Sequence, residues 1–186
     1  MKKMLVIIAM FSFMVAGEMG LSAYGGLGLA NMSTDSDITD AIDFGMKPGL
    51  TLGVTYDKFP VIVGGGLSFR GSVWSATGME DITVKMTYLD LLALYPYAVG
   101  PGNIMAGLNI GINLSATYEY DGETEDMEDV SALDYGLYFG YAYPINEMMS
   151  VNAGYYLGLA NFDDSDSDDK WNHNGILLTV GYALPY

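Results

Sequence analysis

The sequence offers few groups that could catalyse a reaction. It contains no cysteine, so thiol catalysis and thiolate metal sites are excluded. Its one histidine, His173, follows a serine- and aspartate-rich stretch that includes Ser165 and Ser167. A serine hydrolase uses a histidine to activate its nucleophile, but a lone histidine at the top of a strand is usually structural. We therefore predict that the protein is not an enzyme, and hydrolysis is a distant alternative.

The stretch from Asp163 to Asp169 concentrates carboxylates that could bind a hard cation. Ca²⁺ prefers carboxylate oxygens, and the candidate ligands are Asp164, Asp166 and Asp168. The stretch lacks the turn glycine and the closing bidentate glutamate of an EF-hand loop. A solvated, repulsive surface loop is the simpler interpretation. No cofactor or metal site is predicted, and weak binding of divalent cations is the alternative.

Four charged residues lie, by their parity, on the small and polar face of the strand-like segments described below. They are Lys47, Arg70, Asp90 and Asp134. Each lies at a similar distance along the chain from a short turn, so we expect all four inside the folded protein at one level. Because buried charges must be paired, the first interpretation is a structural ion-pair network that fills the interior. A selectivity or gating point in a narrow pore is the alternative.

These residues belong to segments whose side chains alternate with period two, the pattern of a β-strand with two different faces. In the last segment, Ile176, Leu178 and Val180 form one face, and Thr179 and Gly181 belong to the other. Eight such segments are expected, at residues 21–32, 43–56, 61–74, 83–98, 104–118, 133–143, 149–160 and 175–186.

The chemistry of the two faces favours a membrane barrel over a soluble one. One face is rich in Leu, Ile, Val, Tyr and Phe, while the other consists of Gly, Asn, Ser and Thr with a few charges. So large an apolar face would cause aggregation in water, whereas the narrow interior of a small membrane barrel requires small and polar residues. A closed barrel also satisfies its backbone hydrogen bonds in lipid. We predict an all-β fold, an eight-stranded antiparallel up-and-down transmembrane β-barrel.

The connections between the predicted strands alternate between short and long. The short ones are 57–60, 99–102 and 145–147, and the long ones, which contain most of the 23 acidic residues, are 34–42, 75–82, 121–130 and 163–172. Outer-membrane barrels have short periplasmic turns and longer outside loops, so both termini are expected in the periplasm. Phe44, Tyr118 and Tyr120, near the outer strand ends, are expected to face the membrane interface.

Residues 1–17 are predicted to be a cleaved signal peptide, and residues 18–186 the barrel. Met1-Lys2-Lys3 is cationic, and residues 4–16 form an uncharged apolar run. That run is shorter than the roughly 20 apolar residues that a spanning helix needs. The predicted location is the outer membrane of a Gram-negative cell envelope.

The charge balance excludes one class of partner. Seven basic residues stand against 23 acidic ones, with a net charge of −16, and such a surface repels nucleic acid. Hydrophobic residues make up 51% of the chain and aromatic residues 13%, which argues against the disorder that strongly acidic chains often show. Acidic and apolar residues must therefore be segregated along the chain.

Several strand motifs resemble a known family. They are Met46-Lys47-Pro48-Gly49-Leu50, Tyr88-Leu89-Asp90-Leu91, residues 103–111, residues 154–159 and Gly181-Tyr182-Ala183-Leu184. With them the chain resembles the small outer-membrane β-barrel domain family that includes PorT-type proteins and, more loosely, the OmpX and OmpA barrels. The resemblance implies an outer-membrane barrel and no shared catalytic residues. The aromatic terminus, Tyr186, is similar to the signal that the barrel assembly machinery reads.

The sequence thus predicts a monomeric outer-membrane barrel with a structural or surface-interaction role carried by its acidic loops. A small porin-like channel for ions or solutes is the alternative. The expected partners are outer-membrane lipid, the assembly machinery during biogenesis, and an extracellular partner or divalent cations at the loops.

Overall fold

The computed structural model describes residues 20–34, 42–57, 60–78, 80–163 and 170–185. The predicted signal peptide, residues 1–17, lies outside this range. Among the described residues, no helix is long and apolar enough to span a membrane. The strands are β1 (Leu21–Thr34), β2 (Ile42–Tyr56), β3 (Ile62–Ala76), β4 (Ile82–Val99), β5 (Gly102–Tyr120), β6 (Glu123–Asp126), β7 (Leu133–Pro144), β8 (Met149–Gly158) and β9 (Trp171–Ala183).

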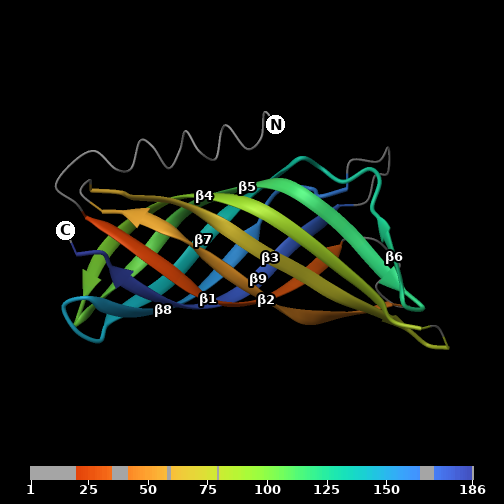
Figure 1. The fold of residues 1–186 in the computed structure, drawn as a ribbon, viewed down its shortest axis with the longest axis horizontal. Helices are drawn as coiled ribbons and strands as arrows, with labels where there is room; N and C mark the ends of the chain where they lie inside the picture. The colour runs from red at the N-terminus through yellow and green to blue at the C-terminus, as the bar shows by residue number, and fades with distance from the viewer. Residues whose placement is uncertain (1–19, 35–41, 58–59, 79, 164–169, 186) are drawn as a thin grey trace.

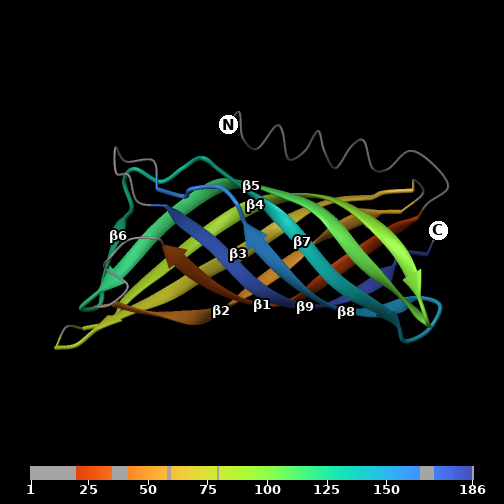
Figure 2. The same ribbon diagram turned by 180° about the vertical axis from the view of Figure 1, so that it is seen from behind.

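Eight of these strands close into an antiparallel barrel (Figures 1 and 2). Strands β1 to β5 pair in sequence order, β5 then pairs with β7, and β7, β8 and β9 follow. The β1–β9 ladder runs from Ser22 opposite Ala183 to Thr34 opposite Trp171 and seals the ring. A closed ring gives backbone groups partners within the sheet, as a wall in contact with lipid requires. The predicted eight-stranded up-and-down barrel is confirmed.

The two ends of the barrel differ in their connections. The short β4–β5 and β7–β8 turns lie at one end, together with the starts of β1 and β3 and the ends of β2 and β9, and the β5–β6 hairpin lies at the other, with the ends of β1 and β3 and the starts of β2, β4 and β9 (Figure 1). We call these the turn end and the loop end. Short turns are periplasmic in outer-membrane barrels, so we propose the same orientation here, with the turn end in the periplasm.

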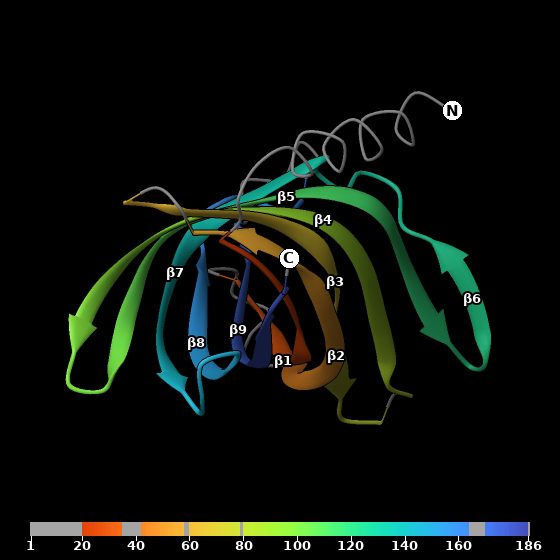
Figure 3. The same cartoon turned by 60° about the vertical axis from the view of Figure 1, so that its left-hand side comes forward.

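The loop end contains a strand within the predicted loop 121–130. Past the barrel wall, β5 turns back at Asp121-Gly122 into β6, so that Tyr120 pairs with Glu123. Asp121 and Gly122 both have positive φ, 50° and 76°, as a two-residue type I′ hairpin turn requires. Asp-Gly is a strong signal for such a turn. Figure 3 shows that β6 stands outside the ring, beside the last part of β5.

The last strand begins at Trp171, earlier than the predicted start at residue 175, and ends at Ala183. The extension is stabilised by β1, which pairs with β9 as far as Thr34 and Trp171. Leu184 and Pro185 follow the strand without belonging to it, and Tyr186 lies outside the described residues.

Two irregularities interrupt the regular alternation of the strands. The register of β2 against β3 shifts between Met46 and Thr51. In β5, Asn113 pairs with Tyr88 and Ser115 pairs with Thr87, which leaves one extra residue between them. One extra residue exchanges the inward and outward faces of the strand beyond it.

The exchange of faces overturns part of the expected aromatic belt. Phe44 lies beyond the irregularity in β2 and Tyr118 beyond the one in β5, and both pack against the buried cluster inside the barrel. The expectation that they face the membrane interface is wrong. Tyr120, in the β5–β6 hairpin, is exposed.

The outer and inner faces otherwise differ as the alternation predicts. Leu27, Leu50 and Leu178 on the outer wall are 54%, 57% and 56% exposed, as a lipid-facing wall requires. The inner face combines large side chains with glycines. A Cβ on Gly154 would overlap the ring of Tyr138, so the glycine makes room for the aromatic side chain inside a narrow barrel.

Candidate functional site

Three of the four charged residues predicted to share a level meet inside the barrel. Arg70 on β3 donates from Nη2 to Oδ1 of Asp90 on β4, and from Nη1 to Oδ2 of Asp134 on β7, at 2.5 Å in both cases. The three side chains are 10%, 8% and 1% exposed. Asp90 is on the neighbouring strand, but β7 is not a neighbour of β3 in the ring, so the Arg70–Asp134 ion pair crosses the lumen. We call these three residues the charge layer.

The rest of the Arg70 side chain is also held in place. Its Nε donates to Oγ of Ser68 at 3.1 Å. Its guanidinium carbon lies 4.6 Å from the ring centroid of Tyr88 and 4.8 Å from that of Tyr156. A buried arginine is stable only with such pairing, and aromatic faces add cation–π attraction. The guanidinium is therefore fixed by partners on all three of its nitrogens and by two aromatic rings.

His173 joins the charge layer, although the sequence pattern did not indicate it. Its Nδ1 lies 3.6 Å from Oδ2 of Asp134, and the side chain is 2% exposed. Its ring also contacts Tyr88 and Phe162 at centroid distances of 5.7 and 5.2 Å. His173 was expected at the top of a strand, between the fourth loop, 163–172, and the regular alternation that begins at residue 175. Continuing the alternation back from the inward-facing Gly175 would have placed it in the lumen.

Lys47, the fourth predicted member, lies elsewhere. Its side chain passes Gly71, and its charge interacts with Lys85 and Glu119, which form an ion pair with each other. Lys85 and Glu119 are partly exposed, so this is a separate, wetter group of charges. The physical reason is the irregularity in β2, where the register against β3 shifts next to Lys47.

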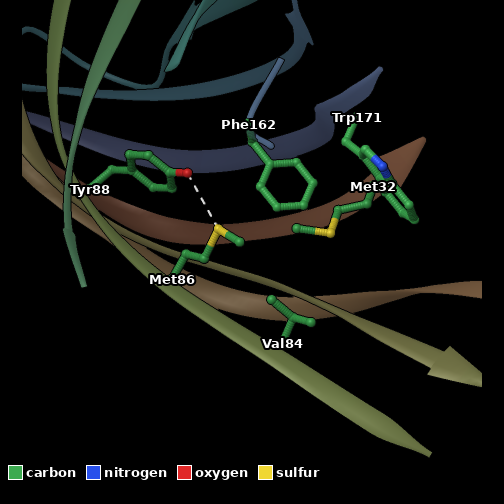
Figure 4. Packing of buried hydrophobic residues seen from close by; sticks show 6 residues of the cluster. All are labelled: Met32, Val84, Met86, Tyr88, Phe162 and Trp171. Carbon is green, nitrogen blue, oxygen red and sulfur yellow. Dashed lines mark hydrogen bonds between the residues drawn. The ribbon is translucent and has the colours of Figure 1, made fainter. Parts of the chain in front are cut away.

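Above the charge layer, toward the loop end, the lumen is filled by an aromatic and methionine cluster (Figure 4). Tyr88 connects the two because its ring covers Arg70 while its hydroxyl contacts Sδ of Met86 at 3.3 Å. Trp171 stacks on Trp74 at a centroid distance of 5.3 Å. The buried members are Met32, Val84, Met86, Tyr88, Phe162 and Trp171. We call them the lumen cluster.

The groups considered for catalysis and metal binding are not brought together in the described structure. Ser165, Ser167 and the candidate calcium ligands Asp164, Asp166 and Asp168 lie outside the described residues. Within the described ranges, no three His, Cys, Asp or Glu side chains gather as a metal site. His173 faces Asp134 and aromatic rings. In the charge layer, the one guanidinium of Arg70 pairs with both carboxylates.

The loop end carries a second group of charges, which is exposed to solvent. In the β5–β6 hairpin the side chains of Asp121, Glu123, Glu125 and Asp126 are all exposed. Tyr118 donates a hydrogen bond from its hydroxyl to Glu125, which ties the hairpin to the lumen cluster. The barrel thus holds an acidic hairpin beyond the apolar wall.

Comparisons with known proteins agree with this architecture. The structure of Neisserial surface protein A (NspA) has a TM-score of 0.68 and 12% identity, over 91% of this chain and 100% of that one. Ail, the attachment invasion locus protein of Yersinia pestis, has a TM-score of 0.47 and 15% identity, over 89% of this chain and 99% of Ail. OprG from Pseudomonas aeruginosa has a TM-score of 0.47 and 16% identity, over 87% and 94%. At 12% identity, the likeness to NspA shows the fold alone, and the matches to Ail and OprG are too distant to add to it.

Among curated protein sequences, none matches the chain. The family described as outer membrane protein beta-barrel domain matches residues 12–164, most of the chain. With the closed ring and its lipid-facing wall, this match determines the location. The chain belongs to the outer membrane protein beta-barrel domain family and is a β-barrel of the outer membrane.

Proposed function

We propose that this protein is a surface-interaction protein, in which a closed barrel anchors acidic loops outside the cell. The observation that carries the proposal is that packed side chains block the lumen. The charge layer bridges the wall through Arg70, Asp90 and Asp134, and the lumen cluster packs above it. Eight-stranded barrels have an interior just wide enough for side chains to fill. A filled interior favours anchoring over conduction.

The β5–β6 hairpin is the part of the loop end that best suits a partner. β6 pairs with β5 along one edge, and no described strand pairs with its other edge. An open edge can accept an added strand through backbone hydrogen bonds. The exposed Glu123, Glu125 and Asp126 surround this edge with negative charge. The matching partner is a basic, extended peptide segment on the outside of the cell.

The first experiment separates this proposal from the channel alternative. The protein is inserted into planar lipid bilayers, and ion conductance is measured. We expect no steady conductance, because the charge layer and the lumen cluster occupy the lumen. Steady single-channel currents from the native protein would refute the closed-anchor proposal and establish the channel.

The second experiment tests the surface interaction with a defined probe. Binding of a fluorescent oligolysine peptide is measured on intact cells that produce the protein. The doubly neutralised variant Glu123→Gln/Glu125→Gln should bind less peptide, and added salt should weaken binding to the native protein. The matched control is Asp57→Asn/Glu147→Gln, which removes the same charge at the turn end. Equal loss in both variants, or no loss in the hairpin variant, would contradict the proposal.

The proposal includes the features inferred from the sequence. We propose cleavage of a signal peptide at residues 1–17, assembly by the barrel assembly machinery, a monomer in the membrane, and a PorT-type subgroup within the family. The closed ring supports the monomer, since β1 and β9 seal the barrel within one chain. A detergent-solubilised protein that crosslinks as a discrete dimer would contradict it.

A further inference from the structure

The lumen on the other side of the charge layer is hollow. A cavity of about 290 Å³ extends from the turn end, where Asp57, Pro144 and Ser150 line it, to Asp90 at its inner end. This end faces the periplasm by the assignment made above. Small-molecule sites begin at about this volume. With liquid water occupying about 30 Å³ per molecule, the space suits a ligand of the order of ten non-hydrogen atoms.

The polar lining of the cavity consists of neutral hydroxyl and amide side chains, such as Thr51 and Asn152, and of two carboxylates. Among the residues that line it are the carboxylates Asp57 and Asp90, and no Lys, Arg or His. Asn109 is 6% exposed, and its side-chain Oδ1 has no hydrogen-bond partner among the described residues. A buried acceptor without a partner is unfavourable, so a donor that enters the cavity is stabilised there.

The charge layer leaves the inner end of the cavity with an excess of negative charge. Arg70 supplies one positive charge against the two negative charges of Asp90 and Asp134. Each nitrogen of Arg70 already donates a hydrogen bond to one of those two carboxylates or to Ser68. Arg70 is therefore poorly placed to bind an incoming anion. His173 contacts Asp134 and does not line the cavity. The attraction toward a cation is enhanced where water is excluded.

The walls between the mouth and the inner end are largely apolar. Ile62, Leu92, Leu94, Met105 and Leu177 line them. Such walls disfavour an inorganic divalent ion, which needs several oxygen ligands at once, and favour a hydrocarbon chain. An ammonium group has three donors and no acceptor, which suits the polar end of the cavity.

We propose that this cavity is a periplasm-facing binding site for a small organic cation, in which an ammonium head reaches Asp90 and Asn109 and a short apolar body lies between the aliphatic walls. The site lies at the opposite end of the barrel from the acidic hairpin. It is therefore independent of the proposed surface interaction. Anions and zwitterions are disfavoured, because no cationic side chain lines the cavity to receive a carboxylate.

The test uses the full-length protein in phosphatidylcholine nanodiscs and three probes of equal chain length. Binding of n-pentylammonium, n-pentanol and n-pentanoate is measured by isothermal titration calorimetry. We expect saturable binding of pentylammonium, weaker binding of pentanol and no saturable binding of pentanoate. Loss of a charge-assisted hydrogen bond weakens binding by about tenfold or more, so the alcohol should differ from the amine by at least that factor. This comparison needs no variant.

Two variants and one control locate the site. Asp90→Asn removes the charge at the inner end, and Ala142→Phe fills the cavity without altering the charge layer. Each should weaken pentylammonium binding by about tenfold or more, while Asp81→Asn, an exposed acid at the loop end, should leave it unchanged. Pentanoate binding as tightly as the amine, unchanged binding in a folded Asp90→Asn or Ala142→Phe protein, or no saturable binding to the native protein would overturn the proposal.

Discussion

The substitution Arg70→Ala is the most direct test of the charge layer. Arg70 forms two ion pairs of 2.5 Å, and the carboxylates it holds are 8% and 1% exposed. Removing one partner of a buried ion pair costs about 3–5 kcal/mol, because the remaining charge is left without compensation. The contacts with Tyr88 and Tyr156 are worth roughly 0.5–2 kcal/mol each. These effects share one side chain and do not add fully, so we expect a loss of about 4–6 kcal/mol.

The assay is urea-induced unfolding in phosphatidylcholine vesicles, followed by tryptophan fluorescence. The two tryptophans, Trp74 and Trp171, stack on each other at the edge of the lumen cluster and therefore report on packing next to the charge layer. The control is Lys85→Ala, which breaks the partly exposed ion pair with Glu119. Exposed pairs contribute little, so this variant should unfold almost as the native protein does.

The triple variant Arg70→Met/Asp90→Asn/Asp134→Asn distinguishes unpaired charge from lost packing. Replacement of a whole buried ion-pair group by neutral residues of similar size is often tolerated, so it should recover much of the stability lost in Arg70→Ala. The reasoning is refuted if Arg70→Ala loses no more stability than Lys85→Ala. A folded Arg70→Ala protein with increased conductance would instead favour the gating interpretation of these charges.

Three further substitutions test the wall and the lumen. Leu178→Arg places a charge on the lipid-facing side of β9, where Leu178 is 56% exposed, and should cost about 2–4 kcal/mol near the bilayer midplane in vesicle unfolding. Gly26→Ala should reduce assembly, measured as the folded fraction in outer membranes, because its Cβ would overlap the backbone of Leu178 and Thr179; normal assembly would contradict this packing. Trp171→Ala removes a buried ring of the lumen cluster and should cost about 3–5 kcal/mol, and a loss below that of Lys85→Ala would argue against the cluster.

The filled part of the lumen and the hollow part have different consequences. The charge layer and the lumen cluster separate the loop end from the periplasmic cavity. A barrel arranged in this way can hold a ligand on one side without conducting it to the other. The conductance and calorimetry experiments therefore address separate properties and can succeed or fail independently.

The alternation of side chains was sufficient to predict the barrel. A strand in a membrane wall must present an apolar face to lipid and a small or polar face to a narrow lumen. This requirement repeats at every second residue, so Ile176, Leu178 and Val180 in β9 could be assigned to the outer wall from the sequence. The same rule placed Arg70, Asp90 and Asp134 inside, where the structure has them.

Other features depended on how the strands pair. The extra residues in β2 and β5 reverse the faces beyond them, so Phe44 and Tyr118 lie in the lumen while Lys47 lies apart from Arg70. These extra residues could not be recognised from the alternation of side chains. Near the strand ends, both faces contain a mixture of apolar and polar residues, so an exchange of the faces does not change the pattern visibly.

The contacts of the charge layer were likewise decided by tertiary structure. The sequence placed Arg70 and Asp90 on neighbouring strands, but the ion pair with Asp134 crosses the lumen, and His173 reaches Asp134 because β1 extends β9 back to Trp171. The local sequence determined the chain's strands and the two chemistries of its wall, since each depends on residues within one segment. Closure of the ring decided which charges meet and where the lumen is filled, since those depend on the stagger between strands far apart in the chain.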